Sequence, residues 1–130
     1  MVSRRRKVLK PNKKRKVRQR ANGICEKEKC YTEIDEKNSE IHHIIPTEFG
    51  GTDDLNNLVA ICLRCHKEIS QYHQRTIVWI KNHEIFLRRN QNIPFWRKQK
   101  TEEEISRLKK ELLTKYRFKN KEINPIDLFL

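Results

Sequence analysis

The chain has 130 residues, of which 35% are hydrophobic, so its length and composition allow one domain with a thin core. Its formal net charge at pH 7 is +13, an excess that is typical of proteins that bind polyanions. No apolar run approaches the roughly 20 residues of a membrane-spanning helix, and no apolar stretch follows the N-terminal charges as in a secretory signal. We therefore expect no membrane partner and an intracellular, reducing location, with cytoplasm, nucleoid and organelle matrix all left open.

The positive charge is concentrated at the two ends of the chain. Residues 1–20 contain 11 Lys and Arg and no acidic residue, residues 88–121 contain 12 basic and four acidic residues, and the stretch between them is mildly acidic. This distribution predicts a folded module with basic extensions that contact the phosphates of a nucleic acid. Residues 1–20 are expected to form a disordered basic N-terminal arm, with room for a short helix near Lys13–Arg20. The expected nucleic-acid-binding side chains of this arm are Arg4, Arg5, Arg6, Lys7, Lys13, Lys14, Arg15, Lys16, Arg18 and Arg20.

The middle of the chain predicts two short strands and a helix. Ser39–Ile45 is a weakly alternating apolar run that ends at a proline, which cannot continue a central strand. A loop over residues 47–57 contains a Gly-Gly pair, and the apolar, partly β-branched strand Leu58–Ile61 follows it. A helical pattern then runs from residue 63 to about residue 90, as one long helix or as two.

The C-terminal third predicts a second helix. Thr101-x-x-Glu104 has the form of a capping box, and apolar residues at helical spacing follow it, so we expect a helix over about 101–117. The apolar patch at residues 93–96 is expected to pack back on the core. The chain is thus divided into an arm (1–20), a folded module (21–90) and a basic helical C-terminal extension (91–130).

Four cysteines form two closely spaced pairs, Cys25-x4-Cys30 and Cys62-x2-Cys65. Each pair has the spacing of a zinc knuckle, and two knuckles make a tetrahedral site in which four thiolates bind Zn²⁺ at about 2.3 Å. A disulfide interpretation requires an exported protein, for which the sequence carries no signal. Four thiolates leave no open position for substrate, so the zinc is expected to be structural and to supply folding free energy to a thin core.

A constellation of polar residues lies between and just after the cysteine pairs. It consists of His42-His43-Ile44, Gly50-Gly51, Asp54, Asn57-Leu58 and Cys62-x-x-Cys65-His66. Over roughly residues 21–72 this set resembles the HNH endonuclease family, in the branch with a zinc-binding cysteine pair on each side of the nuclease motif. The resemblance implies a small α+β fold, a ββα-metal finger on a four-cysteine zinc site, here with added C-terminal helices and the basic arm. It also implies that residues 21–90 are the nuclease module.

The resemblance implies a role for each of four side chains. His43 would be the general base that takes a proton from the attacking water. Asn57 would hold the loop and orient this base, with the neighbouring Asn56 left open as an alternative. His42 and His66 would bind a catalytic divalent cation, and His42 and His43 would exchange roles if the strand register differed by one residue.

The implied ligand set bears on the choice of catalytic metal. With His42 at a position where the family has Asp or His, both protein ligands would be nitrogen atoms, which favours Mn²⁺, Ni²⁺, Co²⁺ or Zn²⁺. Mg²⁺ stays open if phosphate and water supply the other ligands. The expected cofactors are therefore structural Zn²⁺ and a catalytic Mg²⁺, Mn²⁺ or other divalent cation.

The resemblance implies a metal-dependent DNA endonuclease that hydrolyses phosphodiester bonds with a histidine base. The alternative is a non-catalytic zinc-dependent module that binds DNA or RNA within a larger complex. Such a module would use the same basic extensions but would not need the His-Asn-His set. The expected partner is DNA, with RNA left open, and the sequence specifies neither the target site, the choice between nicking and double-strand cleavage, nor the oligomeric state.

Overall fold

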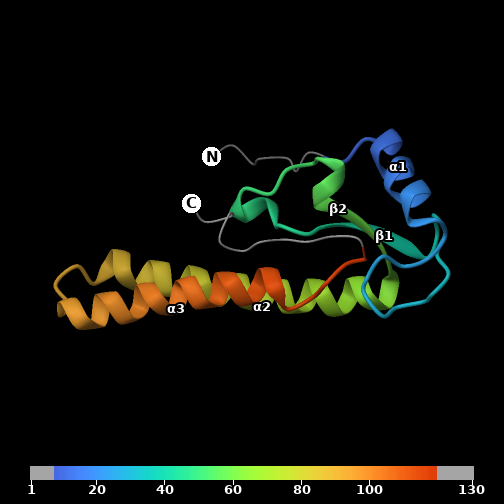
Figure 1. The fold of residues 1–130 in the computed structure, drawn as a ribbon. Coiled ribbons are helices and arrows are strands. Elements are labelled where there is room, and N and C mark those ends of the chain that lie inside the picture. The colour runs from blue at the N-terminus through green and yellow to red at the C-terminus, as the bar shows by residue number, and fades with distance from the viewer. Residues whose placement is uncertain (1–7, 120–130) are drawn as a thin grey trace. The chain divides into compact units, whose positions relative to one another are not determined.

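The structure is a computed structural model that describes residues 8–119, so Arg4, Arg5, Arg6 and Lys7 of the expected arm lie outside it. Within this range the chain has the expected small α+β fold, with one two-stranded sheet, three α-helices and two short 3₁₀-helices (Figure 1). It divides into two compact units, one on each side of the bond between Leu63 and Arg64. Among the described helices, none combines the length and the apolar character that crossing a membrane requires.

The first unit is built on an antiparallel hairpin of β1 (Ser39–His43) and β2 (Leu58–Cys62). The register pairs Ser39 with Cys62 and His43 with Leu58. All five residues of β2 are buried, which fits an apolar run at the centre of a small core. Both predicted strands are therefore present, and each ends within two residues of its predicted boundary.

The loop between the strands folds back on the end of β1. It contains the short helices η1 (Thr47–Phe49) and η2 (Leu55–Asn57). Gly50 has a φ of 83°, a left-handed conformation that glycine adopts readily. At Gly51, a Cβ atom would lie 1.8 Å from the backbone oxygen of Ile45. The Gly-Gly pair is therefore a steric requirement of the loop path.

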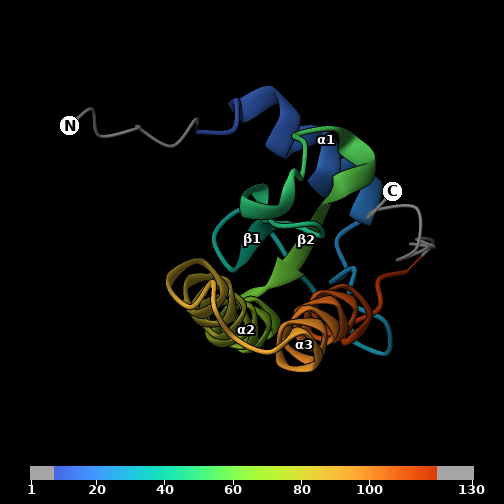
Figure 2. The same ribbon diagram turned by 90° about the vertical axis from the view of Figure 1, so that its left-hand side faces the viewer.

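Helix α1 (Pro11–Ala21) covers the stretch near which the sequence leaves room for a short helix. Pro11 begins this helix, because its fixed φ suits the first helical position. An N–H at that position would have no intrahelical partner, so the lack of one in proline costs no hydrogen bond. Val17 is fully buried and packs with Leu58 and Ala60 of β2. Helix α1 is therefore part of the core of the first unit, and Figure 2 shows it beside the sheet. The expected disorder of residues 1–20 is thus wrong for the part of the arm within this helix, because Val17 gives it an apolar contact with β2.

An ion pair between Arg20 and the buried carboxylate of Glu26 fixes the C-terminal end of α1 to the sheet. Glu26 is 7% exposed, and its carboxylate accepts hydrogen bonds from Arg20 at 2.8 and 3.1 Å and from the Ala60 N–H at 3.0 Å. The Arg20 guanidinium also donates to the carbonyl oxygens of Leu55 at 2.7 Å and Leu58 at 2.6 Å. Each charge is both paired and hydrogen-bonded, which is the condition under which a protein tolerates a buried ion pair.

Replacement of Arg20 by alanine is expected to lower the free energy of unfolding by about 2–3 kcal/mol, because the Glu26 carboxylate would stay buried without its charged partner. Urea-induced unfolding of the zinc-loaded protein, followed by circular dichroism, measures this change. The matched control is Arg15→Ala on the exposed side of the same helix, with an expected change below about 0.5 kcal/mol. Equal effects of the two substitutions would contradict the role assigned to Arg20.

The second unit is a helical hairpin of α2 (Leu63–Arg89), from its second residue onward, and α3 (Phe95–Thr114). The two helices run antiparallel and lie side by side in both views (Figures 1 and 2). The ring of Tyr72 on α2 meets that of Tyr116, just after α3, at 5.7 Å between centroids. Buried residues recur at helical spacing in each helix: Ile69, His73, Thr76 and Ile80 in α2, and Ile105, Leu108 and Leu112 in α3. The pattern after residue 63 is thus one continuous helix.

Two predictions for the C-terminal third are wrong. Helix α3 begins at Phe95, well before the predicted start near residue 101, and the Thr101 hydroxyl donates to the Arg97 carbonyl within the helix at 2.9 Å. The expected capping box is therefore internal, and Pro94 occupies the position before the first turn. Phe95 and Trp96 are 78% and 64% exposed, so the patch does not pack on a core in the described chain.

Candidate functional site

The four cysteines form one cluster, although the two pairs lie far apart in the sequence. The Sγ atoms of Cys25, Cys30, Cys62 and Cys65 all lie within 4.8 Å of one another, and all four residues are buried. Zn–S bonds of about 2.3 Å in a tetrahedron place the sulfur atoms about 3.8 Å apart, so small adjustments bring this set around one ion. The number, type and spacing of the donors fit a structural zinc site.

The backbone around the first cysteine pair forms a tight turn. The Cys30 N–H donates to the Lys27 carbonyl at 3.1 Å, and Lys29 adopts a left-handed φ of 67°. The backbone N–H of Cys62 donates to Cys25 Sγ at 3.3 Å. Burial raises the pKa of the Cys25 thiol, and the backbone N–H groups of Cys62 and Lys27 oppose this shift. A bound cation would add to the opposing effect and hold the sulfur atoms as thiolates.

The strand register separates the two adjacent histidines. His42 pairs with Val59 and is buried, whereas His43 pairs with Leu58 and has a side chain that is 25% exposed. Successive residues of a strand point to opposite faces, so the two imidazoles have different surroundings. Of the two, His43 is the one whose ring is more open to water and thus better placed to receive a proton from it.

Asp53 contacts the ring of His43. Its Oδ1 atom lies 2.8 Å from His43 Nε2. A carboxylate can only accept a hydrogen bond, so Nε2 carries the proton, and the neutral ring then has its lone pair on Nδ1. The sequence pattern does not single out Asp53, because its contact with His43 joins residues ten positions apart in the sequence across a loop. This contact adds one residue to the candidate site.

Asn57 ties the loop to the end of β1. It is 6% exposed, and its Nδ2 donates to the carbonyl oxygens of Thr52 at 2.7 Å and Ile45 at 3.2 Å. Its Oδ1 accepts from the Ile45 N–H at 2.8 Å, and its backbone carbonyl accepts from the Ile44 N–H at 2.8 Å. Asn56, which the sequence leaves open as an alternative, is exposed. The residue that holds the loop is therefore Asn57.

Asn57→Ala is expected to lower the free energy of unfolding by about 2–3 kcal/mol, because the Ile45 N–H and the Thr52 carbonyl would lose their partner. Amide hydrogen exchange at Ile45 is expected to accelerate in parallel, since that N–H would no longer be bonded. Asn56→Ala is the matched control, with an expected change below about 0.5 kcal/mol. If Asn56→Ala destabilised the protein more than Asn57→Ala, the assignment of the loop-holding residue would be wrong.

His66 lies in the first turn of α2, directly after Cys65. Its Nε2 atom is 3.3 Å from the Ser70 hydroxyl oxygen. Because Cys65 belongs to the cysteine cluster, the backbone next to His66 is tied to that cluster. Of the two expected ligands of a catalytic cation, His42 is thus on β1 and His66 at the start of α2, and the metal-binding role of both stays a prediction.

Two of the expected nucleic-acid-binding side chains are engaged within the first unit. Arg18 donates to the hydroxyl oxygen of Ser39 at 3.1 Å and to its carbonyl oxygen at 3.2 Å. Arg20 binds Glu26 and two carbonyl oxygens, as described above. Both guanidinium groups therefore have a structural use, and the basic residues of α1 that remain candidates for phosphate contact are Lys13, Lys14, Arg15 and Lys16.

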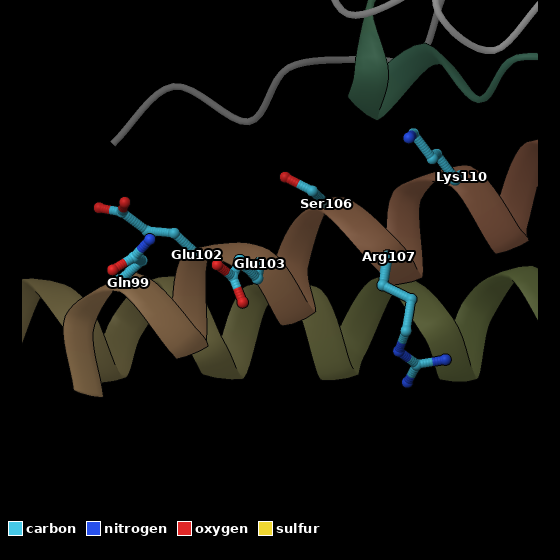
Figure 3. A pocket seen from close by; sticks show the side chains of 6 residues that line it. All are labelled: Gln99, Glu102, Glu103, Ser106, Arg107 and Lys110. Carbon is cyan, nitrogen blue, oxygen red and sulfur yellow. The ribbon is translucent and has the colours of Figure 1, made fainter. Parts of the chain in front are cut away.

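A separate pocket of about 460 Å³ lies on α3 and is lined by Gln99, Glu102, Glu103, Ser106, Arg107 and Lys110. Figure 3 shows that all six side chains come from this helix, with Lys110 and Arg107 pointing to opposite sides of it. The lining contains neither histidine nor cysteine, and Arg107 forms ion pairs with Glu104 and Glu111. The pocket therefore lacks the groups on which the candidate chemistry depends.

The fold and the site define a class of small α+β domain with a four-cysteine centre beside a histidine-bearing hairpin. Residues 24–71 match the model of the HNH endonuclease family. This match over 48 of the 130 residues confirms the resemblance indicated by the sequence motifs. The matched segment contains all four cysteines, His42, His43, Asn57 and His66, and it lies within the expected nuclease module.

The chain is also similar to a curated protein, the type IV methyl-directed restriction enzyme EcoKMcrA of Escherichia coli (strain K12). The two sequences are 37% identical over 68 residues, which is 48% of this chain and 24% of the relative. The chain thus matches about a quarter of the length of that enzyme.

Proposed function

We propose that this protein is a metal-dependent DNA endonuclease that hydrolyses phosphodiester bonds. The HNH domain and the similarity to a restriction enzyme support a role in DNA binding or cleavage. The observation that favours hydrolysis is the pairing of His43 with Asp53 in a loop that Asn57 holds. A module that only binds DNA does not need a partly exposed imidazole with one nitrogen fixed as a donor.

In the proposed reaction, His43 is the general base. Its Nδ1 atom accepts a proton from water as the water oxygen forms a bond to phosphorus. Asp53 accepts the hydrogen bond from Nε2–H, so it fixes the tautomer and stabilises the positive charge that the ring gains. The bond between phosphorus and the leaving oxygen breaks, and that oxygen takes up a proton, so one phosphodiester and one water yield a phosphomonoester and an alcohol.

Asn57 acts in this proposal as a positioning residue. Its amide binds the backbone of Ile45 and Thr52, which lie on the two sides of the short helix that follows β1. The end of the strand and the start of the segment that carries Asp53 are thereby held at a fixed separation. Loss of this amide would loosen the pairing of His43 with Asp53, and a displacement of about 1 Å in a catalytic group is enough to lower a rate strongly.

We also propose that His42 and His66 bind the catalytic divalent cation. Imidazole nitrogens suit Mn²⁺, Co²⁺, Ni²⁺ and Zn²⁺, and Mg²⁺ stays open if phosphate and water complete its shell. When bound, this cation would stabilise negative charge on the phosphate and on the leaving oxygen. The zinc proposed at the four cysteines has a different task, because four thiolates leave no position for a substrate.

The proposed substrate is DNA, whose phosphates would be attracted by the basic residues of α1 and of the 91–130 extension. Only cleavage is carried over from the restriction enzyme, and its methyl-directed recognition is not, because the similarity covers 24% of its length. Cysteine ligands persist as thiolates in a reducing environment, so we propose that the protein works inside the cell.

The nuclease proposal predicts that the zinc-loaded protein converts supercoiled plasmid into nicked or linear forms when Mn²⁺ or Mg²⁺ is added. His43→Ala is expected to lower the rate by at least about 100-fold, because a positioned general base contributes a factor of that size or more. The matched control is His83→Ala, which removes a half-buried histidine of α2 outside the candidate site and is expected to leave the rate unchanged. Gel quantification of the plasmid forms over time measures both rates.

A non-catalytic zinc module that binds DNA or RNA is the competing function. It predicts binding of the plasmid without any conversion by the folded, zinc-loaded wild type, whichever divalent metal is supplied. That outcome would exclude the nuclease proposal and leave the binding function in place. Cleavage that persists unchanged in His43→Ala would instead show that another residue is the base.

A further inference from the structure

The exposed side of α1 carries a regular set of polar side chains. The spacing places four of them on one face of the helix, because Arg15, Lys16 and Gln19 follow Asn12 by three, four and seven residues. All four side chains are exposed. Val17 lies on the opposite face, where it is fully buried. The helix contains no acidic residue, so this face has no negative charge of its own.

The buried side of α1 is held firmly in place. Val17 packs on β2, Arg18 binds Ser39 through two hydrogen bonds, and Arg20 is paired with Glu26. The exposed face is therefore presented by a helix that is already folded and fixed to its unit. On that face Arg15 donates to Asn12 Oδ1 at 3.1 Å, so two of the side chains are arranged relative to each other. Binding of a partner would therefore require little further ordering of the helix, so the entropic cost of binding would be lower than for a flexible segment.

The residue types on this face match the edges of DNA bases. Arginine forms paired hydrogen bonds with guanine, and asparagine and glutamine form them with adenine, in the major groove. That groove is about 12 Å wide and admits an α-helix, and the 11 residues of α1 span about 16 Å. The major groove of duplex RNA is deep and too narrow for such contacts, so duplex DNA fits better.

We propose that α1 is a DNA-recognition helix that lies in the major groove and reads base edges with Asn12, Arg15 and Gln19, while Lys16 contacts phosphate. The choice of DNA as the partner rests on the proposed function. The inference goes beyond that function, which requires the basic residues only to attract phosphates of any sequence. It assigns sequence preference to this chain itself, through three residues of which two, Asn12 and Gln19, carry no charge.

The test is to select binding sites from a pool of randomised DNA duplexes with the full-length, zinc-loaded His43→Ala protein. No other divalent metal is added, so that cleavage does not interfere. We expect an enriched sequence that contains guanine or adenine at adjacent positions. Fluorescence anisotropy then measures affinity for the enriched duplex and for a scrambled duplex at the same salt concentration, which gives a preference ratio. Absence of an enriched sequence would overturn the proposal.

Substitutions in α1 separate base reading from charge. Arg15→Lys keeps the charge but loses the paired hydrogen bonds, so it is expected to lower the preference ratio about tenfold with little change for the scrambled duplex. Asn12→Ala and Gln19→Ala are expected to relax the preference at single positions. Arg117→Ala removes one positive charge at an exposed position outside α1, and it is expected to weaken binding to both duplexes equally. An unchanged ratio in Arg15→Lys and in the Asn12→Ala/Gln19→Ala double variant would overturn the proposal.

The binding test and the plasmid test fail independently. Sequence selection through α1 without any plasmid cleavage would support the recognition helix and exclude the nuclease function. Plasmid cleavage with equal affinity for every duplex would support the nuclease function and exclude the recognition helix. Circular dichroism of each variant confirms that the exposed substitutions leave the fold intact.

Discussion

The convergence of four buried thiols is the constraint on which the rest of the first unit depends. Cys25 and Cys30 lie in a turn before the hairpin, Cys62 ends β2, and Cys65 lies in the first turn of α2. A metal ion at these sulfur atoms closes the chain around the segment that carries β1 and the loop. Since the hydrophobic core of this unit is small, binding of zinc would supply a large part of its folding free energy.

A second constraint divides the basic residues of α1 between two tasks. The side that faces the sheet uses its arginines for internal hydrogen bonds, with Arg20 satisfying the buried carboxylate of Glu26 and backbone carbonyls of the loop. The outward side retains its charged and amide groups for a partner. Charge at the N-terminal end of the chain therefore has a structural use in addition to the proposed binding, whereas composition alone suggests only binding.

The parts of the structure that depend on local pattern could be predicted from the sequence. Cysteine spacing predicts the cysteine cluster, apolar runs predict β1 and β2, and helical periodicity predicts α2. The loop-holding role of Asn57 followed from family resemblance, and the structure shows the hydrogen bonds that distinguish it from Asn56.

Contacts that depend on the path of a loop or on how a helix packs could not be predicted from local sequence patterns. The Asp53–His43 contact depends on the path of an irregular loop, and the pairing of Arg20 with Glu26 depends on how α1 packs on β2. The predicted start of α3 is wrong because two local signals each mark a possible helix start, the capping box at Thr101 and Pro94. The helix begins directly after Pro94, the earlier of the two. His73 of α2 is likewise buried, although polar residues lie mostly on the exposed face of a helix.

We propose that this chain has two metal sites with separate tasks, a closed cysteine site that maintains the fold and a histidine site that serves the reaction. Counting both metals in one sample tests it most directly: zinc by mass spectrometry, and bound Mn²⁺ by electron paramagnetic resonance in the presence of a DNA duplex. We expect one zinc and one Mn²⁺ per chain in the wild type, and in His66→Ala one zinc with loss of the bound Mn²⁺. Unchanged Mn²⁺ binding in His66→Ala, or loss of its zinc, would rule out two separate sites.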